Sequence, residues 1–306
     1  MLLKFAAKEF LEDREFKNLS KYTLNRYRRI LNEFQEYCFD MEVLNVEDVV
    51  PNIIKGYLLY CQKERGNNPT TKNTKLRCLK TFFNFVEESE IISAKRNPVV
   101  KVSYAREEVK IEVFTDYQIK QMLAYFRSLK QRDKSFFAYR GYQLLIYLLG
   151  TGSRLGETVN LRWKDIDLIN GTATVWGKKR EQSSIPLTDK LVKDLMEYKY
   201  FCQKHFKNDS EYVFVSQTNE QLTPNAIKCL FKRLSKIMNF SDVRLSCHTF
   251  RHTFAHRSLM AGMDIFTLQK MLRHSNIEMT QKYLSIWGTA LKEQNEKFNP
   301  LNSIDF

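Results

Sequence analysis

The sequence lacks long hydrophobic stretches. None of its uncharged runs approaches the roughly 18 residues that a membrane-spanning helix needs. The first 16 residues carry Glu9, Glu12, Asp13 and Arg14 where a signal peptide would have its apolar stretch and cleavage site. We therefore expect neither membrane insertion nor secretion, and we expect a cytoplasmic protein.

Closely paired cysteines are also absent. The six cysteines contain no C-x-x-C pair, and most have aromatic or apolar neighbours; they are Cys38, Cys61, Cys78, Cys202, Cys229 and Cys247. This pattern predicts buried free thiols in a reducing compartment. It does not support a disulfide framework or a zinc ribbon.

Internal repeats and low-complexity tracts are absent as well. Hydrophobic residues make up 43% of the chain, which excludes wholesale disorder. The 306 residues are enough for about two domains, at roughly 150 residues each.

Positive charge is what the sequence has in excess. Lys and Arg number 49 against 35 Asp and Glu, a formal net charge of +14, and residues 112–306 carry most of the excess. The basic residues are interleaved with aromatic and aliphatic ones, as on a folded surface that follows phosphate groups. The composition predicts a polyanionic partner, but by itself it leaves open a generically basic soluble protein.

The first hundred residues have helical periodicity. Ser20 is a predicted N-cap for an amphipathic helix, residues 46–65 form a second helical stretch, and Thr70 or Thr71 is predicted to cap a third. The basic side chains of these helices are expected off the apolar faces. We assign DNA contacts to four of them: Arg26, Arg28, Lys72 and Lys75.

Periodicity is lost after Lys95, where Asn97-Pro98 and a charge-rich stretch predict an extended connection. We therefore divide the chain into a helical domain (1–105), a linker (106–111) and a second domain (112–306).

The second domain is expected to be mainly helical with a small antiparallel sheet. Thr115 is a predicted helix cap, and residues 135–150 form a nearly all-apolar helix that should be central in the core. Short β-type runs occur at 172–177, 183–187 and 212–216. Helical periodicity returns in 187–206 and 223–238.

Four separated segments concentrate residues that suit phosphate chemistry. They are TGSRLGE (151–157), WGKKR (176–180), HTFRH (248–252) and LRHSNIEMTQKY (272–283). Glu157 follows Arg154 by one turn and can hold its guanidinium, while His248 and Arg251 share a helix face and can address one phosphate. Taken singly, the first segment also fits a structural Arg–Glu pair and the third a basic helix start.

The order and spacing of these segments resemble the tyrosine recombinase family, which includes phage integrases and Xer-type recombinases. In that family TG-x-R-x-x-E supplies the first Arg, a hairpin Lys follows a Gly, and H-x-x-R lies on a helix. A GHS-like segment then precedes a Tyr by nine residues, the spacing of His274 and Tyr283 here. The resemblance covers essentially the whole chain, because the N-terminal helical unit that closes on NPV (97–99) looks like the family's SAM-like core-binding domain.

The resemblance implies a mainly α fold, a helical core-binding domain followed by an α+β catalytic domain. It also implies roles. Arg154 and Arg251 would clamp the non-bridging oxygens of a scissile phosphate, and His248 and His274 would add hydrogen-bond donors or proton transfer there.

The same resemblance implies that Tyr283 attacks the phosphorus and forms a 3′-phosphotyrosyl link, while Lys178 protonates the 5′-oxygen leaving group. Lys179 or Arg180 remains an alternative for this acid, and both are also candidates for DNA contact. Because the link retains the energy of the phosphodiester, neither a metal, ATP nor another cofactor is implied.

A few further residues either support the expected site or depart from the family pattern. Glu157 is expected to hold Arg154. His252 is expected to support the reacting residues without itself touching the phosphate. The i, i+4 spacing of His248, His252 and His256 invites a zinc interpretation, but H-T-F-A-H lacks the Glu of H-E-x-x-H. Arg273 replaces the usual Gly before His274 and is expected to alter the turn or to contact phosphate.

Assembly is likewise inferred from the resemblance. We expect no separate arm-site-binding domain before the helical unit, and therefore simple core sites on double-stranded DNA. We also expect a nucleoid-associated protein. The free protein would be a monomer or dimer and the DNA-bound form a tetramer, with a tail (about 286–306) that reaches a neighbouring subunit and possible accessory DNA-bending proteins.

Two other functions remain open on sequence alone. A type IB topoisomerase has a similar set of site residues. A helix-turn-helix regulator would explain the two helices of residues 254–275 without any chemistry.

Overall fold

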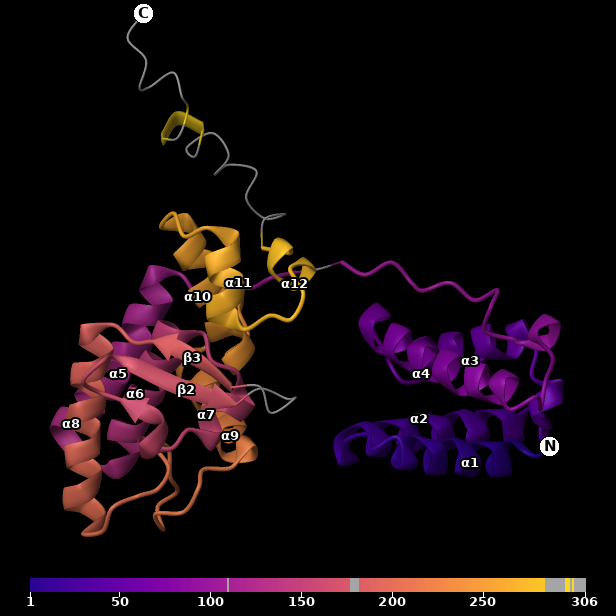
Figure 1. The fold of residues 1–306 in the computed structure, drawn as a ribbon, viewed down its shortest axis with the longest axis horizontal. Helices are drawn as coiled ribbons and strands as arrows, with labels where there is room; N and C mark the ends of the chain where they lie inside the picture. Colours follow the sequence, from indigo (N-terminus) through magenta and orange to yellow (C-terminus); the bar gives the residue numbers. More distant parts are fainter. Residues whose placement is uncertain (109, 177–181, 284–294, 298, 300–306) are drawn as a thin grey trace, which may run out of the picture. The chain divides into compact units, whose positions relative to one another are not determined.

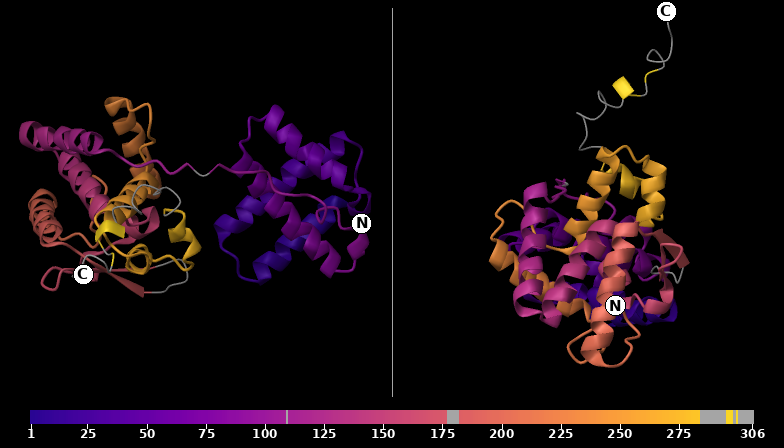
Figure 2. Two further views of the ribbon diagram at one scale, coloured as in Figure 1. Left: turned by 90° about the horizontal axis from the view of Figure 1, so that it is seen from above. Right: turned by 90° about the vertical axis from the view of Figure 1, so that its left-hand side faces the viewer.

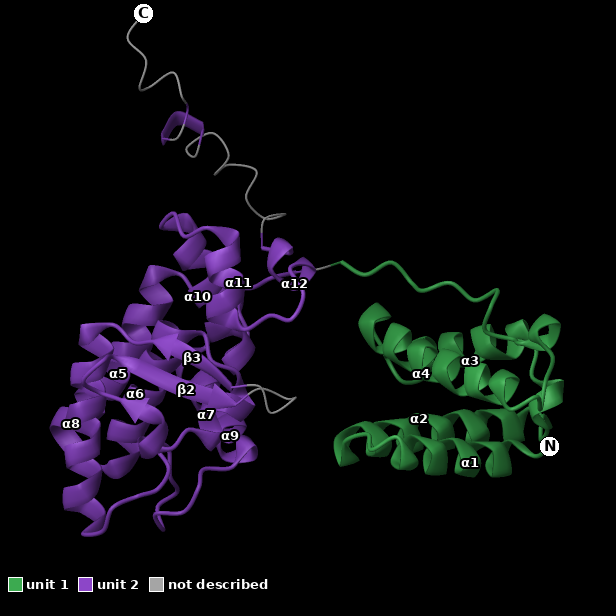
Figure 3. Ribbon diagram, viewed as in Figure 1, with its two compact units in different colours: residues 1–109 green, residues 110–306 purple. Residues whose placement is uncertain are grey.

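The computed structural model describes residues 1–108, 110–176, 182–283, 295–297 and 299. The chain divides into two compact units, Met1–Val109 and Lys110–Phe306 (Figure 3).

The first unit is helical. Its α-helices are α1 (Leu3–Phe16), α2 (Lys21–Asp40), α3 (Pro51–Lys63) and α4 (Pro69–Glu88), with the short 3₁₀ helices η1 (Val46–Asp48) and η2 (Ala94–Arg96) (Figure 1). Aromatic side chains fill the core between them. The rings of Phe10 and Phe82 meet edge to face at 5.6 Å, as do those of Phe34 and Tyr57 at 5.2 Å.

Side-chain caps set where these helices begin. The Ser20 hydroxyl accepts the Thr23 N–H (3.2 Å), which confirms the predicted cap of α2. The predicted cap of α4 is wrong. Asn68 caps that helix by accepting the Thr71 N–H (2.8 Å), and Pro69 follows as its first residue, a position where proline's missing N–H costs nothing.

The second unit combines helices with one sheet. Its long helices are α5 (Asp116–Asp133), α6 (Phe136–Thr151), α8 (Asp189–Phe206), α9 (Pro224–Met238) and α10 (Cys247–Met260). Its short elements are α7 (Leu155–Asn160), η3 (Trp163–Asp165), β1 (Ile166–Asp167), β2 (Thr172–Trp176), β3 (Gln182–Pro186), α11 (Ile265–Leu272) and α12 (Glu278–Gln281).

Helix α6 is central, as the apolar run predicts: it packs against α5, α8 and α10. Leu144, Leu145, Tyr147 and Leu148 are completely buried along it. A full capping box at Thr115 begins α5, as predicted. Burial of α6 on several sides fixes the position of its C-terminal end, where the segment TGSRLGE (151–157) begins.

The sheet is antiparallel in the order β1-β2-β3, with Ala173 opposite Ile185. Its small size and antiparallel pairing confirm the predicted fold class. The run 212–216 does not join it. Val213, Phe214 and Val215 are all buried, without the alternation of a strand that has one exposed face, and the run makes only isolated bridges, Arg162 with Tyr212 and Val215 with Gln221.

All six cysteines are free, and five are buried as predicted. Cys229 is exposed, contrary to prediction, because it faces outward from α9. No helix among the described residues is long and apolar enough to cross a membrane.

Candidate active site

A sharp turn after α6 presents the first motif. Gly152 ends α6 with φ 58°, and its N–H donates to the Leu148 carbonyl (3.0 Å). A Cβ at Gly152 would lie 2.6 Å from Cδ1 of Phe254, so both the left-handed backbone and the close packing require glycine. Two residues later Arg154 stands at the N-terminus of α7.

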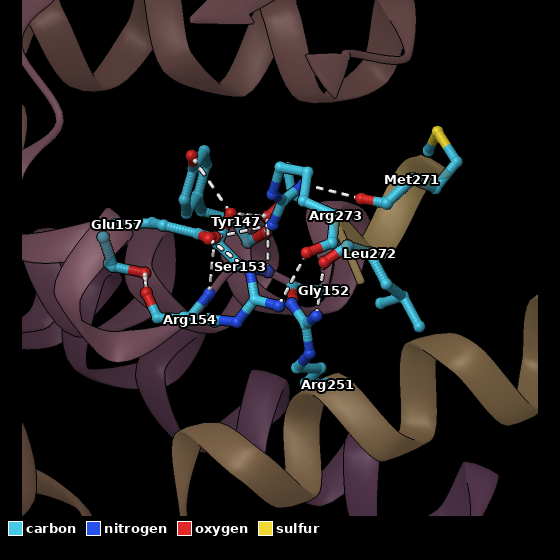
Figure 4. A network of polar contacts seen from close by, with 11 residues as sticks. Tyr147, Gly152, Ser153, Arg154, Glu157, Arg251, Met271, Leu272 and Arg273 are labelled. Carbon is cyan, nitrogen blue, oxygen red and sulfur yellow. Dashed lines mark hydrogen bonds and ion pairs between the residues drawn. The ribbon is translucent and has the colours of Figure 1, made fainter. Parts of the chain in front are cut away.

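Glu157 holds Arg154 from within the same turn (Figure 4). Its Oε1 accepts from Arg154 Nη1 (2.7 Å), and its Oε2 accepts from the Arg154 N–H (2.9 Å). Burial of the Glu157 carboxyl raises its pKa, but Arg273 and Arg154 more than offset this and keep its pKa below the usual value. The carboxylate is thus charged, and the Arg154 side chain stays 33% exposed.

Arg251 reaches the same place from α10 and is buried. Its Nη1 donates to the Gly152 carbonyl (2.7 Å), and its Nη2 donates to the Leu272 carbonyl. Burial, then the charges of Arg154 and Arg273, lower its pKa to about 9. Arg251 therefore remains a cation at neutral pH and joins three segments of the chain.

His274 follows α11 and is almost fully buried. Its Nδ1 lies 2.8 Å from the Thr280 hydroxyl. Burial and the charges of Arg251, Arg154 and Arg273 lower its pKa to about 3, so the ring is neutral at physiological pH.

His248 lies one turn before Arg251 on α10 and is exposed. Desolvation by its surroundings, followed by the charges of Arg251, Arg154 and Arg244, lowers its pKa.

Tyr283 is buried beside these groups, with 4% of its surface exposed. Its ring belongs to an apolar cluster with Phe254, Leu268 and Leu272 from α10 and α11, helices that lie side by side (Figure 2). Burial raises the pKa of its hydroxyl, while Arg251 and Arg154 act in the opposite direction.

His252 contacts the Tyr283 hydroxyl directly: its Nδ1 lies 2.9 Å from that oxygen. This contact is with the tyrosine, so His252 touches one of the reacting residues from the helix α10. The zinc interpretation gains no support, since no group of three or more His, Cys, Asp or Glu within the described ranges is arranged to hold a metal ion.

The side chain of Arg273 is buried and paired with a carboxylate, which does not favour the predicted phosphate contact. Its side chain is 8% exposed, and its Nη2 donates to Glu157 Oε2 (2.6 Å). Arg273 adopts φ 54°, the left-handed conformation typical of glycine.

The assignment of Lys75 to the DNA surface is also wrong. Lys75 is 7% exposed, and its ammonium group binds Glu33 and the Cys61 thiol. The spacing put Lys75 off the apolar stripe of α4, but α2 and α3 cover that side as well. Arg26 and Arg28 are exposed and Lys72 is half-buried.

Three candidates, Lys178, Lys179 and Arg180, lie outside the described residues, as does most of the tail from 286 to 306. Two contributors were missed from the sequence. Thr280 contacts His274, and the charge of Arg244 acts on His248. No periodicity or motif distinguishes either one, because their partners come from other elements.

The described groups form one centre: two guanidiniums, uncharged imidazoles and a tyrosine. Charge-assisted donors of this kind suit the equatorial oxygens of a phosphoryl group in transfer, and a phenol is a nucleophile.

Comparison with known proteins agrees with this chemistry. The phage integrase family matches residues 112–287, and the phage integrase SAM-like domain matches residues 1–103. "Tyrosine recombinase XerC" of Leptospira interrogans is 27% identical over 284 residues, covering 93% of this chain and 89% of the relative. The protein of the same name from Caldanaerobacter subterraneus is 29% identical over 265 residues, covering 86% and 72%.

Solved structures share the fold. The Tn1549 transposon integrase in complex with transposon right end DNA has a TM-score of 0.78 at 20% identity, covering 97% of this chain and 99% of that one. A lambda integrase dimer bound to a COC′ core site has a TM-score of 0.74 at 17% identity, covering 91% and 97%.

Proposed function

The chain belongs to the phage integrase family and is a site-specific tyrosine recombinase, and from this premise we propose that Tyr283 forms a 3′-phosphotyrosyl link to DNA. The observation that carries the proposal is the gathering of Arg154, Arg251, His274 and Tyr283 in one centre from three separate segments. A regulator that only bound DNA would have no use for it.

Arg154 and Arg251 bind the non-bridging oxygens of the scissile phosphate. The contacts of Arg251 with two backbone carbonyls hold its guanidinium still, which limits reorganisation during the reaction. His248 and His274, uncharged at physiological pH, hydrogen-bond to the same oxygens or transfer protons there.

Tyr283 gives its hydroxyl proton to one of the uncharged imidazoles, His248 or His274, and attacks the phosphorus as the bond to the 5′-oxygen breaks. Lys178 gives its own proton to that leaving oxygen. For attack, the hydroxyl must exchange His252 for the phosphate, because it is buried in its present position. The freed 5′-hydroxyl of another strand then attacks the phosphotyrosyl link, and the tyrosine regains its proton.

The partner is double-stranded DNA with specific core sites, in the nucleoid of the cytoplasm. The functional division is 1–105 for core-site binding, 106–111 as linker and 112–306 for catalysis. The assembly is a tetramer on DNA and a monomer or dimer when free, and DNA-bending proteins assist where site geometry requires them. Deletion of 287–306, which make up almost all of the exchanged tail, should abolish synapsis; undiminished synapsis would refute the tail's role.

The decisive experiment uses a nicked duplex that carries the site and traps the covalent intermediate. Wild-type protein should become attached to the DNA, and Tyr283→Phe should give no adduct. Tyr200 on α8 is 69% exposed and provides the matched control, because Tyr200→Phe should retain the adduct. Adduct formation by Tyr283→Phe would refute the assignment of the nucleophile.

The two alternatives make different products. A type IB topoisomerase relaxes supercoiled plasmid without exchanging strands, whereas the recombinase exchanges strands between two sites. A regulator forms no adduct at all. The helices α10 and α11 have the order expected of a helix-turn-helix motif. They also carry Arg251 and Arg273, whose contacts join these helices to the segment of Arg154, and a regulator that only binds DNA does not need these contacts.

A further inference from the structure

Arg273 occupies a backbone position that arginine seldom adopts. It ends α11 with φ 54° and ψ 48°, and its N–H donates to the Lys270 carbonyl (3.0 Å). A non-glycine residue in this conformation is strained. A glycine would adopt this conformation without strain, so the contacts of the Arg273 side chain must offset the strain of its backbone.

That side chain points inward to a defined set of partners (Figure 4). Nη2 donates to Glu157 Oε2 (2.6 Å), and Nη1 donates to the Met271 carbonyl (2.6 Å). The side chains of Arg273 and Glu157 are 8% and 4% exposed, respectively. An ion pair so well shielded from water is not weakened by solvent screening as surface pairs are.

The backbone of Arg273 completes a ring of contacts. Its carbonyl accepts from Arg154 Nη2 (2.8 Å), while Arg154 Nη1 donates to Glu157 Oε1 (2.7 Å). Arg154, Glu157 and Arg273 therefore each contact the other two. The ring joins the N-terminus of α7 to the turn that carries His274, although these segments are more than 100 residues apart in sequence.

We propose that Arg273 is a positioning residue, which aligns Arg154 and His274 around the scissile phosphate by sharing the Glu157 carboxylate. This inference deepens the proposed function and rests on it. Arg273 touches no reacting atom in this role. It acts by fixing the distance between two groups that must bind the same phosphate.

Sharing also determines how Arg154 is oriented. With Arg273 on Oε2, the guanidinium of Arg154 gives only Nη1 to the carboxylate. Without Arg273, Glu157 is free to take Arg154 in a two-pronged pair, the geometry these groups prefer. Arg154 would then turn away from the phosphate, and the turn before His274 would lose its tie to α7.

The experiment compares two variants with one control. Arg273→Gly removes the side chain and relieves the strain, whereas Arg273→Asn removes the charge but keeps a residue that tolerates the left-handed conformation. Lys134 is exposed and ends α5 with φ 45°, so Lys134→Gly makes the same backbone change away from the centre. Single-turnover adduct formation on the nicked duplex and DNA affinity are measured for each, with thermal unfolding to check folding.

Both Arg273 variants should form the adduct about 100-fold more slowly, the effect expected of a misplacement near 1 Å. Their DNA affinity should stay within about threefold of the wild-type value, because the replacements change buried contacts of the centre and leave the charges on the protein surface as they are. Lys134→Gly should match wild type in both. Adduct formation by Arg273→Gly at the wild-type rate, or a loss confined to DNA affinity, would overturn the proposal.

A second readout does not depend on cleavage. The Arg273 charge contributes to lowering the pKa of His274 to about 3, so NMR titration of Arg273→Asn should give a higher His274 pKa than wild type. An unchanged value would show that the Arg273 charge does not act on the His274 ring and would overturn the inference. If wild-type protein forms no adduct while this shift occurs, the proposed function fails and the coupling of Arg273 to His274 stands.

Discussion

The Nδ1 atom of His252 lies 2.9 Å from the hydroxyl oxygen of Tyr283, although 31 positions separate the two residues. Burial, then the charges of His248 and Arg251, lower the pKa of His252 to about 4. At physiological pH the ring is therefore uncharged, and its Nδ1 accepts a hydrogen bond from the tyrosine hydroxyl when the other nitrogen carries the ring hydrogen.

This contact predicts an energetic coupling between the two side chains. His252→Phe should lower the free energy of unfolding by about 1–3 kcal/mol, because it leaves a buried hydroxyl without its partner. In the double variant His252→Phe with Tyr283→Phe the loss should be smaller than the sum of the single losses. Urea unfolding of the four proteins measures this cycle; strictly additive losses would mean that the contact contributes nothing.

Stability should depend on pH through His274. Its pKa is about 3 in the folded chain, against an ordinary 6.5, so the unfolded chain binds more protons between these values. The contribution is fully present above about pH 6.5 and is lost as the pH falls toward 3, by up to about 1.4 kcal/mol per pH unit. Denaturant unfolding from pH 7.5 to 5 should give a shallower dependence for His274→Gln than for wild type; parallel curves would contradict the assignment.

Replacement of two lysines of α4 should affect stability to very different extents. Lys75→Met should lower the free energy of unfolding by about 3 kcal/mol, because it leaves the Glu33 carboxylate without its buried ammonium partner. Lys72 is more exposed, and Lys72→Met should change stability by no more than about 0.5 kcal/mol.

DNA binding should separate them in the other direction. Lys72→Met should weaken DNA affinity and reduce its salt dependence by about one unit of log–log slope. Lys75→Met should keep the wild-type slope at a temperature where it is folded. A lower salt-dependence slope for Lys75→Met would mean that Lys75 contacts DNA after all.

The general acid can be identified among Lys178, Lys179 and Arg180 by chemistry alone. Replacing the 5′-bridging oxygen of the scissile phosphate by sulfur gives a thiolate leaving group, which needs no proton. Lys178→Ala should therefore cleave normal DNA at least about 100-fold more slowly than wild type, within the usual range for a lost general acid, and the sulfur substrate nearly normally. Lys179→Ala serves as the control. If the sulfur substrate restored cleavage by Lys179→Ala instead, the general acid would be Lys179.

Much of this protein could be predicted from local patterns in its sequence. Helical periodicity and caps predicted α2, α5 and α6, since hydrogen bonds to residues three positions away are local. The motif residues Arg154, His248, Arg251, His274 and Tyr283 could be selected because their types, order and spacing are visible in one dimension.

Tertiary structure decided what each side chain touches. Lys75 was assigned to the surface because spacing on one helix does not reveal which other elements cover it. Arg273 was assigned a phosphate contact because the motif does not reveal that Glu157 lies within its reach. His252 could be predicted to lie near the reacting residues but not to touch Tyr283, since only the packing of Tyr283 against α10 and α11 sets that 2.9 Å contact. The sequence alone determined which groups are available for phosphate chemistry, and the three-dimensional fold determined which carboxylate, carbonyl or hydroxyl each one meets, because those partners come from segments as many as 119 residues away.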